Sequence, residues 1–218
     1  MKIKLIVLVI IILTGITSSS FAQKDRKLSN GFSINLVTGF PSSVYGLPND
    51  TQIDAAEELG GIWGLKFGNR WYFSPQDKYG IGLMVNWLDF TIATQSDQIA
   101  GNTITNAVAD VSFLQFGPVG TYAATENIAL DGYFNFRPTV FENLSIPSGD
   151  DAYGWAGFGF SYALGGAFRY KILNVGIEYV FGGVKTSYIT TGSSSSNDPT
   201  NTYKLMTNSF RVLLGLKF

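Results

Sequence analysis

The sequence predicts an all-β protein: an eight-stranded antiparallel up-and-down transmembrane β-barrel with short turns at one end and long loops at the other. Three observations predict this fold. Apolar residues alternate with small or polar residues along most of the chain, and a period of two is typical of β-strands. No apolar run after Ala22 is long enough for a membrane-spanning helix. The links between the alternating segments are long and short in turn.

The composition excludes several classes of protein. Hydrophobic residues make up 45% and charged residues 14% of the chain, so an ordered protein is expected. The charged share is usually about 25%, and this shortfall, beside 15% aromatic residues, indicates that part of the surface faces something other than water. The absence of cysteine and histidine excludes disulfides, thiolate and imidazole metal ligands, and histidine-assisted nucleophiles. A net charge of −1 does not suggest a nucleic-acid partner.

The first 22 residues resemble an export signal. Lys2 and Lys4 precede an apolar run over residues 5–13, and Ala22 ends a stretch with small residues at the positions that a signal peptidase reads. The run is far shorter than the roughly 20 residues of a spanning helix. We therefore expect a signal peptide over residues 1–22 and one barrel domain over residues 23–218.

The first three predicted strands cover residues 32–40, 63–73 and 79–87, and each has one apolar face. These faces carry Phe32, Ile34, Leu36 and Phe40; Trp63, Leu65, Phe67, Trp71 and Phe73; and Tyr79, Ile81, Leu83, Val85 and Trp87. The opposite faces hold mainly small, polar or charged residues.

The fourth predicted strand, residues 108–123, is less regular. Val111 and Phe113 favour one face, while Leu114 and Phe116 favour the other. Because the parity changes here, and because Pro118 cannot donate a ladder hydrogen bond, we expect a bulge near Leu114.

The last four predicted strands cover residues 128–137, 157–170, 173–182 and 209–218. Residues 157–170 show the alternation most clearly, since Phe158, Phe160, Tyr162 and Leu164 share one face and glycine, serine and alanine fill the other. Bulky residues outside and small or polar residues inside are the pattern of a barrel surrounded by lipid.

The links between these strands fall into two kinds. Residues 41–58, 93–106, 142–154 and 189–203 form long polar links, whereas residues 74–78, 124–127 and 170–173 form short ones. A soluble sandwich has no reason to keep all its long loops at one end. A barrel whose strands run between two compartments does, and its sheet must close because unpaired backbone groups are costly in hydrocarbon.

The last predicted strand makes the likeness more specific. It alternates and has an aromatic residue at its end, with the apolar row Phe210, Val212, Leu214, Leu216 and Phe218. This segment resembles the terminal strand of bacterial outer-membrane proteins, and the whole chain resembles small barrels of the OmpA and OmpX type. The resemblance implies a Gram-negative outer membrane, contact with lipid and lipopolysaccharide, and assembly by the barrel-assembly machinery, which reads this last strand. It implies no particular activity.

The inward positions of the predicted barrel include charged residues. An eight-stranded barrel is just wide enough for side chains to fill it, so these charges must pair with one another. They are Lys66, Arg70, Asp131, Arg137, Arg169, Glu178 and Arg211. From their heights along neighbouring strands we expect the pairs Glu178–Arg211 and Asp131–Arg169. Because basic residues outnumber acidic ones, Asp110 is a candidate for a further inward carboxylate.

Aromatic residues near the strand ends are expected to form the two interfacial girdles of a membrane barrel. At the short-turn end they are Trp71, Tyr79, Tyr170 and Phe218, and at the long-loop end Phe40, Trp87, Phe141 and Phe181.

The long links carry acidic residues and no lysine or arginine. The main candidates for an acidic extracellular surface are Asp50, Asp54, Glu57, Glu58, Asp150 and Asp151, and the links also hold Asp97, Glu142 and Asp198. Such carboxylates could collect hard cations. No regular calcium-loop spacing is present, however, so a solvated surface is the favoured interpretation, and no metal or cofactor is expected.

These observations favour a non-enzymatic outer-membrane protein with a plugged polar interior, acting as an envelope scaffold or meeting an extracellular or envelope protein partner. The alternative is a narrow channel for ions or small solutes, or a barrel subunit of a larger outer-membrane assembly. An enzyme is not expected, since histidine is absent and no Ser-x-x-Lys motif occurs.

Overall fold

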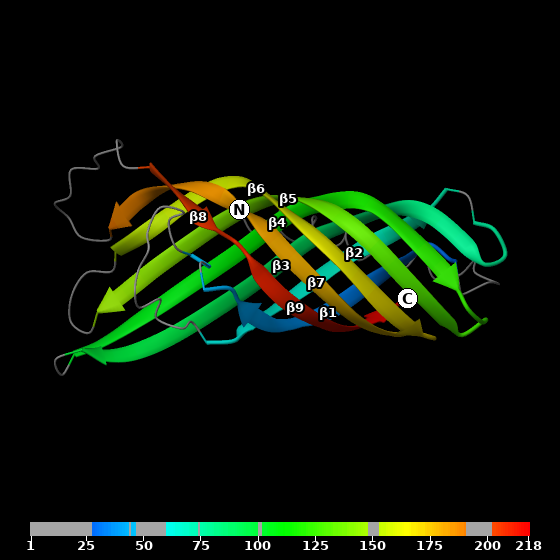
Figure 1. The fold of residues 1–218 in the computed structure, drawn as a ribbon, viewed down its shortest axis with the longest axis horizontal. Helices are drawn as coiled ribbons and strands as arrows, with labels where there is room; N and C mark the ends of the chain where they lie inside the picture. The colour runs from blue at the N-terminus through cyan, green and yellow to red at the C-terminus, as the bar shows by residue number, and fades with distance from the viewer. Residues whose placement is uncertain are drawn as a thin grey trace, which may run out of the picture.

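The computed structural model describes residues 28–43, 45–46, 60–73, 75–99, 102–147, 153–190 and 202–218. These residues form nine antiparallel strand segments of one sheet (Figure 1). The segments are β1 (Gly31–Pro41), β2 (Ile62–Tyr72), β3 (Tyr79–Ile99), β4 (Asn102–Ala123), β5 (Ile128–Pro147), β6 (Tyr153–Tyr170), β7 (Leu173–Thr190), β8 (Thr202–Met206) and β9 (Ser209–Lys217). Among the described residues, no helix is long and apolar enough to cross a membrane.

The sheet closes into a ring of eight strands. Each of β1 to β7 pairs with the next, β7 also pairs with β9, and β9 pairs with β1. β8 and β9 are two halves of the eighth strand, because Lys204 and Ser209 both pair with β7 in one continuous register. The predicted fold class, an eight-stranded antiparallel up-and-down barrel, is therefore confirmed, with an interruption in its last strand.

The interruption has a local cause. At Gly182 the backbone φ is 129°, in a region that favours glycine. The Gly182 N–H donates to the side-chain Oδ1 of Asn208 over 3.1 Å, and the Thr207 N–H donates to the Gly182 carbonyl over 3.0 Å. These contacts replace the ladder between the two halves of the strand.

Two of the predicted long links are wrong, because most of their residues are strand. β3 continues to Ile99 and β4 begins at Asn102, so little of residues 93–106 is loop. In the same way β5 continues to Pro147 and β6 begins at Tyr153 within residues 142–154. Alternation reveals a strand only where its two faces meet different surroundings, and these polar extensions run beyond the apolar part of the barrel. Most of residues 41–58 and 189–203 lies outside the described residues.

Two bulges change which residues face inward. The predicted bulge near Leu114 is confirmed: the register against β5 shifts between Ser112 and Phe116, and Leu114 has a φ of 52°. A second bulge lies in β3, where Phe67 pairs with Leu88 but Gly68 pairs with Asn86, leaving Trp87 as the extra residue. This bulge turns Asp89 inward, just beyond the end of the strand predicted over residues 79–87.

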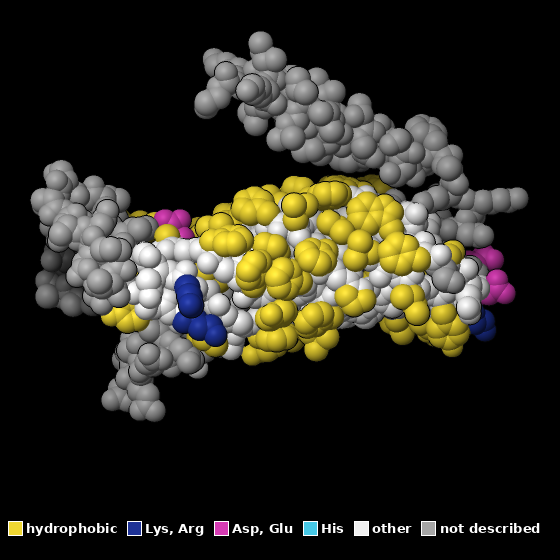
Figure 2. Space-filling view, turned by 90° about the horizontal axis from the view of Figure 1, so that it is seen from above, with side chains coloured by type: hydrophobic (Ala, Val, Ile, Leu, Met, Phe, Trp, Pro, Cys, Tyr) yellow, Lys and Arg dark blue, Asp and Glu magenta, His cyan; other side chains and the backbone are white. Residues whose placement is uncertain are grey.

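The distribution of polarity is inverted relative to a soluble protein. Bulky aliphatic residues point outward, so that Leu36 is 61% and Ile81 68% exposed, whereas Arg137 and Arg211 are 0% exposed. Figure 2 shows the outward side chains as a broad apolar area (the apolar band) over the middle of the face in view. An apolar exterior of this kind requires lipid around it.

The predicted aromatic girdles are wrong for two of their eight residues, Trp87 and Phe141. Trp87 packs edge to face on Trp71, with ring centroids 6.2 Å apart, so these two rings cannot belong to girdles at opposite ends of the barrel. Phe40, Trp87, Tyr79, Tyr170 and Phe218 are exposed on the outside, and Trp71 and Phe181 are partly exposed. Phe141 is fully buried, because it shares the inward parity of Arg137 and Thr139 on β5.

Candidate functional site

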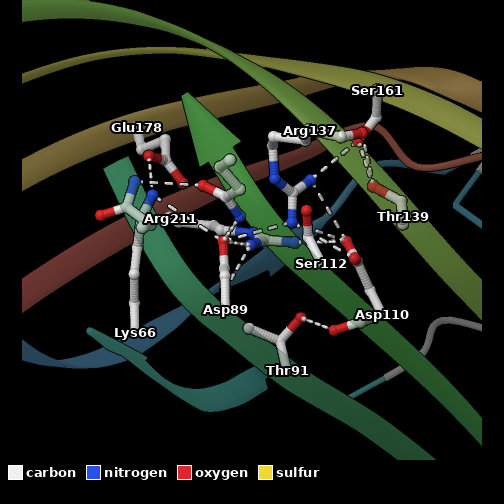
Figure 3. A network of polar contacts seen from close by, with 12 residues as sticks. Lys66, Asp89, Thr91, Asp110, Ser112, Arg137, Thr139, Ser161, Glu178 and Arg211 are labelled. Carbon is white, nitrogen blue, oxygen red and sulfur yellow. Dashed lines mark hydrogen bonds and ion pairs between the residues drawn. The ribbon is translucent and has the colours of Figure 1, made fainter. Parts of the chain in front are cut away.

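Four charged residues from four strands meet in the middle of the barrel: Asp89 of β3, Asp110 of β4, Arg137 of β5 and Arg211 of β9 (Figure 3). Arg211 Nη2 lies 2.7 Å from Asp110 Oδ2, and its Nη1 lies 3.2 Å from Asp89 Oδ2. Arg137 Nη2 lies 3.2 Å from both Asp89 Oδ2 and Asp110 Oδ1. All four residues are fully buried, so each charge is compensated inside the cluster.

Neutral side chains complete this central cluster. Gln115 Nε2 donates to Asp89 Oδ2 over 2.7 Å. Arg137 Nη1 donates to Ser161 Oγ over 3.1 Å, and Arg211 Nε donates to Ser209 Oγ over 3.2 Å. Buried charges need such partners for their remaining hydrogen-bonding capacity.

A second pair extends the cluster toward the short-turn end. Lys66 Nζ of β2 lies 2.5 Å from Glu178 Oε2 of β7, and Tyr133 Oη donates to the same oxygen over 3.1 Å. Lys66 Nζ also lies 3.7 Å from Asp89 Oδ2, which connects this pair to the central cluster.

A third group surrounds Asp131 of β5. Arg169 binds this carboxylate with two nitrogens, Nε at 2.8 Å and Nη2 at 2.9 Å, and Arg70 Nη1 contacts it as well. Thr121 Oγ1 donates to Asp131 Oδ1 over 2.6 Å, and Tyr72 Oη shares a 2.7 Å hydrogen bond with Thr121. The guanidinium group of an arginine can donate two parallel N–H hydrogen bonds to the two oxygens of one carboxylate, as Arg169 does here.

The structure places all seven sequence-predicted interior residues inside the barrel, each of them buried. It contains the expected Asp131–Arg169 pair, and Asp110 faces inward. The expected Glu178–Arg211 pair is wrong. The two residues are partners in the register of β7 and β9, but the Arg211 side chain extends across the lumen to Asp89 and Asp110, and Glu178 binds Lys66 instead.

Sequence reasoning missed two interior charges. Asp89 lay outside the expected strand and is turned inward by the bulge at Trp87. Lys217, 6% exposed, donates from Nζ to the Ser29 carbonyl over 2.7 Å at the short-turn end. Lys217 has the same parity as Arg211 on β9, so the alternation alone could have found it.

Apolar side chains close the interior at the long-loop end. This apolar plug consists of Tyr45, Ile62, Ala93, Val108, Phe141, Val184 and Leu205. Tyr45 and Phe141 pack edge to face with ring centroids 5.4 Å apart, and the Gly46 N–H donates to the Met206 carbonyl over 2.8 Å.

Little space remains between these groups. A cavity of about 10 Å³ lies among Ser33, Asn35, Lys66, Arg70 and Asn174, together with other lining residues. That volume holds about one water molecule, so this cavity has no room for an organic ligand.

The remaining predicted residues lie elsewhere. Phe210, Val212, Leu214 and Leu216 form the outward row of β9, and Phe218 follows its end. Asp50, Asp54, Glu57, Glu58, Asp150 and Asp151 lie outside the described residues. Within the described part of the chain, no group of acidic side chains could hold a metal ion.

A closed eight-stranded antiparallel barrel with an apolar exterior and a paired, charged interior defines this chain as a small barrel of the outer-membrane type. No family model matches the chain, and no curated protein matches it. Among solved structures it is similar to Ail, the attachment invasion locus protein of Yersinia pestis. In complex with the heparin analogue sucrose octasulfate, Ail is 13% identical over 87% of this chain and 97% of its own, with a TM-score of 0.46. A second structure of Ail has the same identity and coverage, with a TM-score of 0.44.

Proposed function

We propose that this protein is a non-enzymatic barrel of the outer membrane, exported by its first 22 residues, that serves as an envelope scaffold and presents its long loops to an extracellular or envelope partner. One observation carries this proposal: Arg137 and Arg211 bridge the lumen between Asp89 and Asp110. An interior closed in this way holds the barrel together and does not conduct.

The energetics of the central cluster favour a plug over an ion path. A passing ion would have to separate fully buried partners, and breaking one such pair costs about 3–5 kcal/mol. Among its own side chains, the apolar plug above the cluster offers an ion only the Tyr45 hydroxyl to replace its water. An ion would therefore have to pass both the apolar plug and the central cluster.

The strand extensions favour a role at the surface. On β3 the outward apolar residues end at Ile92, yet the strand continues to Ile99, paired with β4 throughout. Likewise, β5 and β6 stay paired up to Ser145 and Tyr153. The barrel wall therefore rises beyond the apolar band as a hydrogen-bonded sheet, which is a firm support for loops that bind a partner.

Electrical recording from the purified mature protein in planar bilayers tests the closed interior. We expect no steady unitary current from the wild type, and brief openings at most from Arg211→Ala. Steady unitary currents in the wild type that Arg211→Ala abolishes would contradict the plug and support the alternative, a narrow channel.

Crosslinking in intact cells tests the surface role. A photoreactive residue at position 97, near the tip of the β3–β4 hairpin, should capture a partner, while the same residue at position 126, in a short turn, should not capture it. If both positions, or neither, capture the same proteins, the long-loop end is not the partner surface.

A further inference from the structure

Two lysines lie directly opposite each other on the outside of the barrel: Lys185 of β7 and Lys204 of β8. Both are exposed, while their neighbours Val184 and Leu205 point inward and are fully buried. Residues in this position have β-carbons about 4.5–5.5 Å apart, and like charges at that spacing repel each other. No carboxylate in the described part of the chain forms an ion pair with either lysine. The pair therefore forms a concentrated positive site.

The lysine pair lies at the edge of the apolar band. Below Lys185, on the same outward face of β7, come Gly183, Phe181 and Tyr179, and the last two rings stack with centroids 6.0 Å apart. Figure 2 shows a dark blue patch where the apolar band ends on the side of the long loops. The other exposed lysines with described side chains, Lys78 and Lys171, lie in the short turns at the opposite end.

Gly183 lets Lys204 lean toward the apolar band. A β-carbon at position 183 would lie 2.6 Å from Cε and 3.0 Å from Cγ of Lys204, so the stem of this lysine occupies the place of the missing side chain. Gly183 is two residues nearer to the band than Lys185, the register partner of Lys204. The aliphatic stem thus lies against the apolar surface while the ammonium group stays at its edge, as lysines do at a membrane interface.

We propose that Lys185 and Lys204 bind the phosphate group of a phosphorylated lipid in the outer leaflet. A headgroup phosphate supplies negative charge to the pair, and its oxygens accept hydrogen bonds from both ammonium groups. The acyl chains of the same lipid then lie along Phe181 and Tyr179. This inference deepens the proposed function and rests on it, since the pair meets an outer-leaflet lipid only when the barrel spans a bilayer with its long loops outside.

The test uses the mature chain in phosphatidylcholine nanodiscs with increasing amounts of bisphosphorylated lipid A, and native mass spectrometry measures the lipid A retained. Each lysine near an anionic lipid contributes about a 5-fold gain in affinity. We therefore expect the double variant Lys185→Gln/Lys204→Gln to have a ~30-fold lower affinity for lipid A. The control, Lys78→Gln/Lys171→Gln, removes the same charge at the other end and should retain lipid A like the wild type.

Three further measurements keep the result unambiguous. Gly183→Ala keeps both charges but displaces the Lys204 stem, and we expect an intermediate loss of about 5-fold. Dephosphorylated lipid A should bind wild type and double variant equally. Inorganic phosphate at 10 mM, on the order of a hundred times the protein concentration, should not displace lipid A; displacement would assign the pair to free phosphate and overturn the lipid site.

Two outcomes separate this inference from the proposed function. Equal retention by the wild type and both double variants, in chains that float with lipid vesicles, would overturn the lipid site alone. Failure of the wild-type chain to float with vesicles would contradict the outer-membrane function as well.

Discussion

Arg211 and Asp110 are joined across the barrel interior, with Arg211 Nη2 2.7 Å from Asp110 Oδ2. They belong to opposite sides of the ring, because β1, β2 and β3 stand between β9 and β4 on one side and β5, β6 and β7 on the other. The guanidinium group therefore spans the lumen. Its Nη1 also contacts Asp89, so one side chain ties β9 to two distant strands.

Replacing Arg211 by methionine should destabilise the barrel strongly. Asp110 would keep only Arg137, which it shares with Asp89, while Asp89 would also keep the more distant Lys66. An uncompensated buried charge costs about 3–5 kcal/mol. Urea unfolding from lipid vesicles, followed by tryptophan fluorescence, measures the change. The control Lys78→Met, at an exposed turn position, should stay within about 0.5 kcal/mol of the wild type. Similar values for the two variants would show that water enters the central cluster.

The Lys66–Glu178 pair should behave as one unit. Lys66→Met and Glu178→Leu each leave a buried charge without its partner, while the double variant leaves neither. We expect the double variant to be more stable than the sum of the single effects predicts, by about 1–3 kcal/mol in a double-mutant cycle. Additive effects would contradict the 2.5 Å contact between Lys66 Nζ and Glu178 Oε2.

Phe141→Ala should open a cavity in the apolar plug. Phe141 is fully buried against Tyr45, and removing a buried phenylalanine side chain costs about 3–5 kcal/mol. The matched change Phe73→Ala, at a side chain that is 72% exposed, should cost about 1 kcal/mol or less. The same unfolding assay compares them, and a Phe141→Ala variant as stable as Phe73→Ala would show that the plug is loosely packed.

A hydrogen bond on the outer face should also contribute to the stability of the barrel. Trp87 Nε1 donates to Asn69 Oδ1 over 2.6 Å on the outside of β2 and β3. Trp87→Phe leaves the Asn69 amide without this partner beside lipid, which should cost about 1–3 kcal/mol. Adding Asn69→Leu should recover most of that loss, whereas Trp63→Phe, at an exposed ring, should change little. A double variant less stable than Trp87→Phe would refute the role of this bond.

The export signal predicts the start of the mature chain. Cleavage after Ala22 leaves Gln23 as the first residue, which intact-mass measurement of the protein extracted from outer membranes will detect. Ala22→Leu should retain the signal, because the peptidase reads a small residue there. A mature protein that still carries residues 1–22 would exclude the signal.

The outward face of the barrel could be predicted because lipid and lumen demand opposite side chains on neighbouring residues. Phe158, Phe160 and Tyr162 show this, since all three are exposed where the alternation placed them. The bulge at Leu114 was also predictable, because two bulky residues in succession cannot both obey the alternation. The bulge at Trp87 left the same mark, because Trp87 and Leu88 are also adjacent bulky residues. The predicted strand ended at Trp87, and Asp89 was missed for that reason.

The register of neighbouring strands predicts an ion pair only where the two side chains lie on adjacent strands. Asp131 and Arg169 lie on adjacent strands at nearly the same height, and their pairing followed from sequence position alone. Arg211 lies beside Glu178 in register but reaches across a narrow lumen, because its long side chain finds two carboxylates there. No local pattern contains that information.

The sequence by itself determined that this chain is a membrane-spanning barrel of eight strands, because alternation and link length are local properties that lipid and two compartments impose on every strand. Only the tertiary structure decided which charges meet, where the strands end beyond the apolar band, and that Tyr45 and Phe141 close the long-loop end. These features depend on ring closure, which brings residues far apart in sequence to face one another across the lumen.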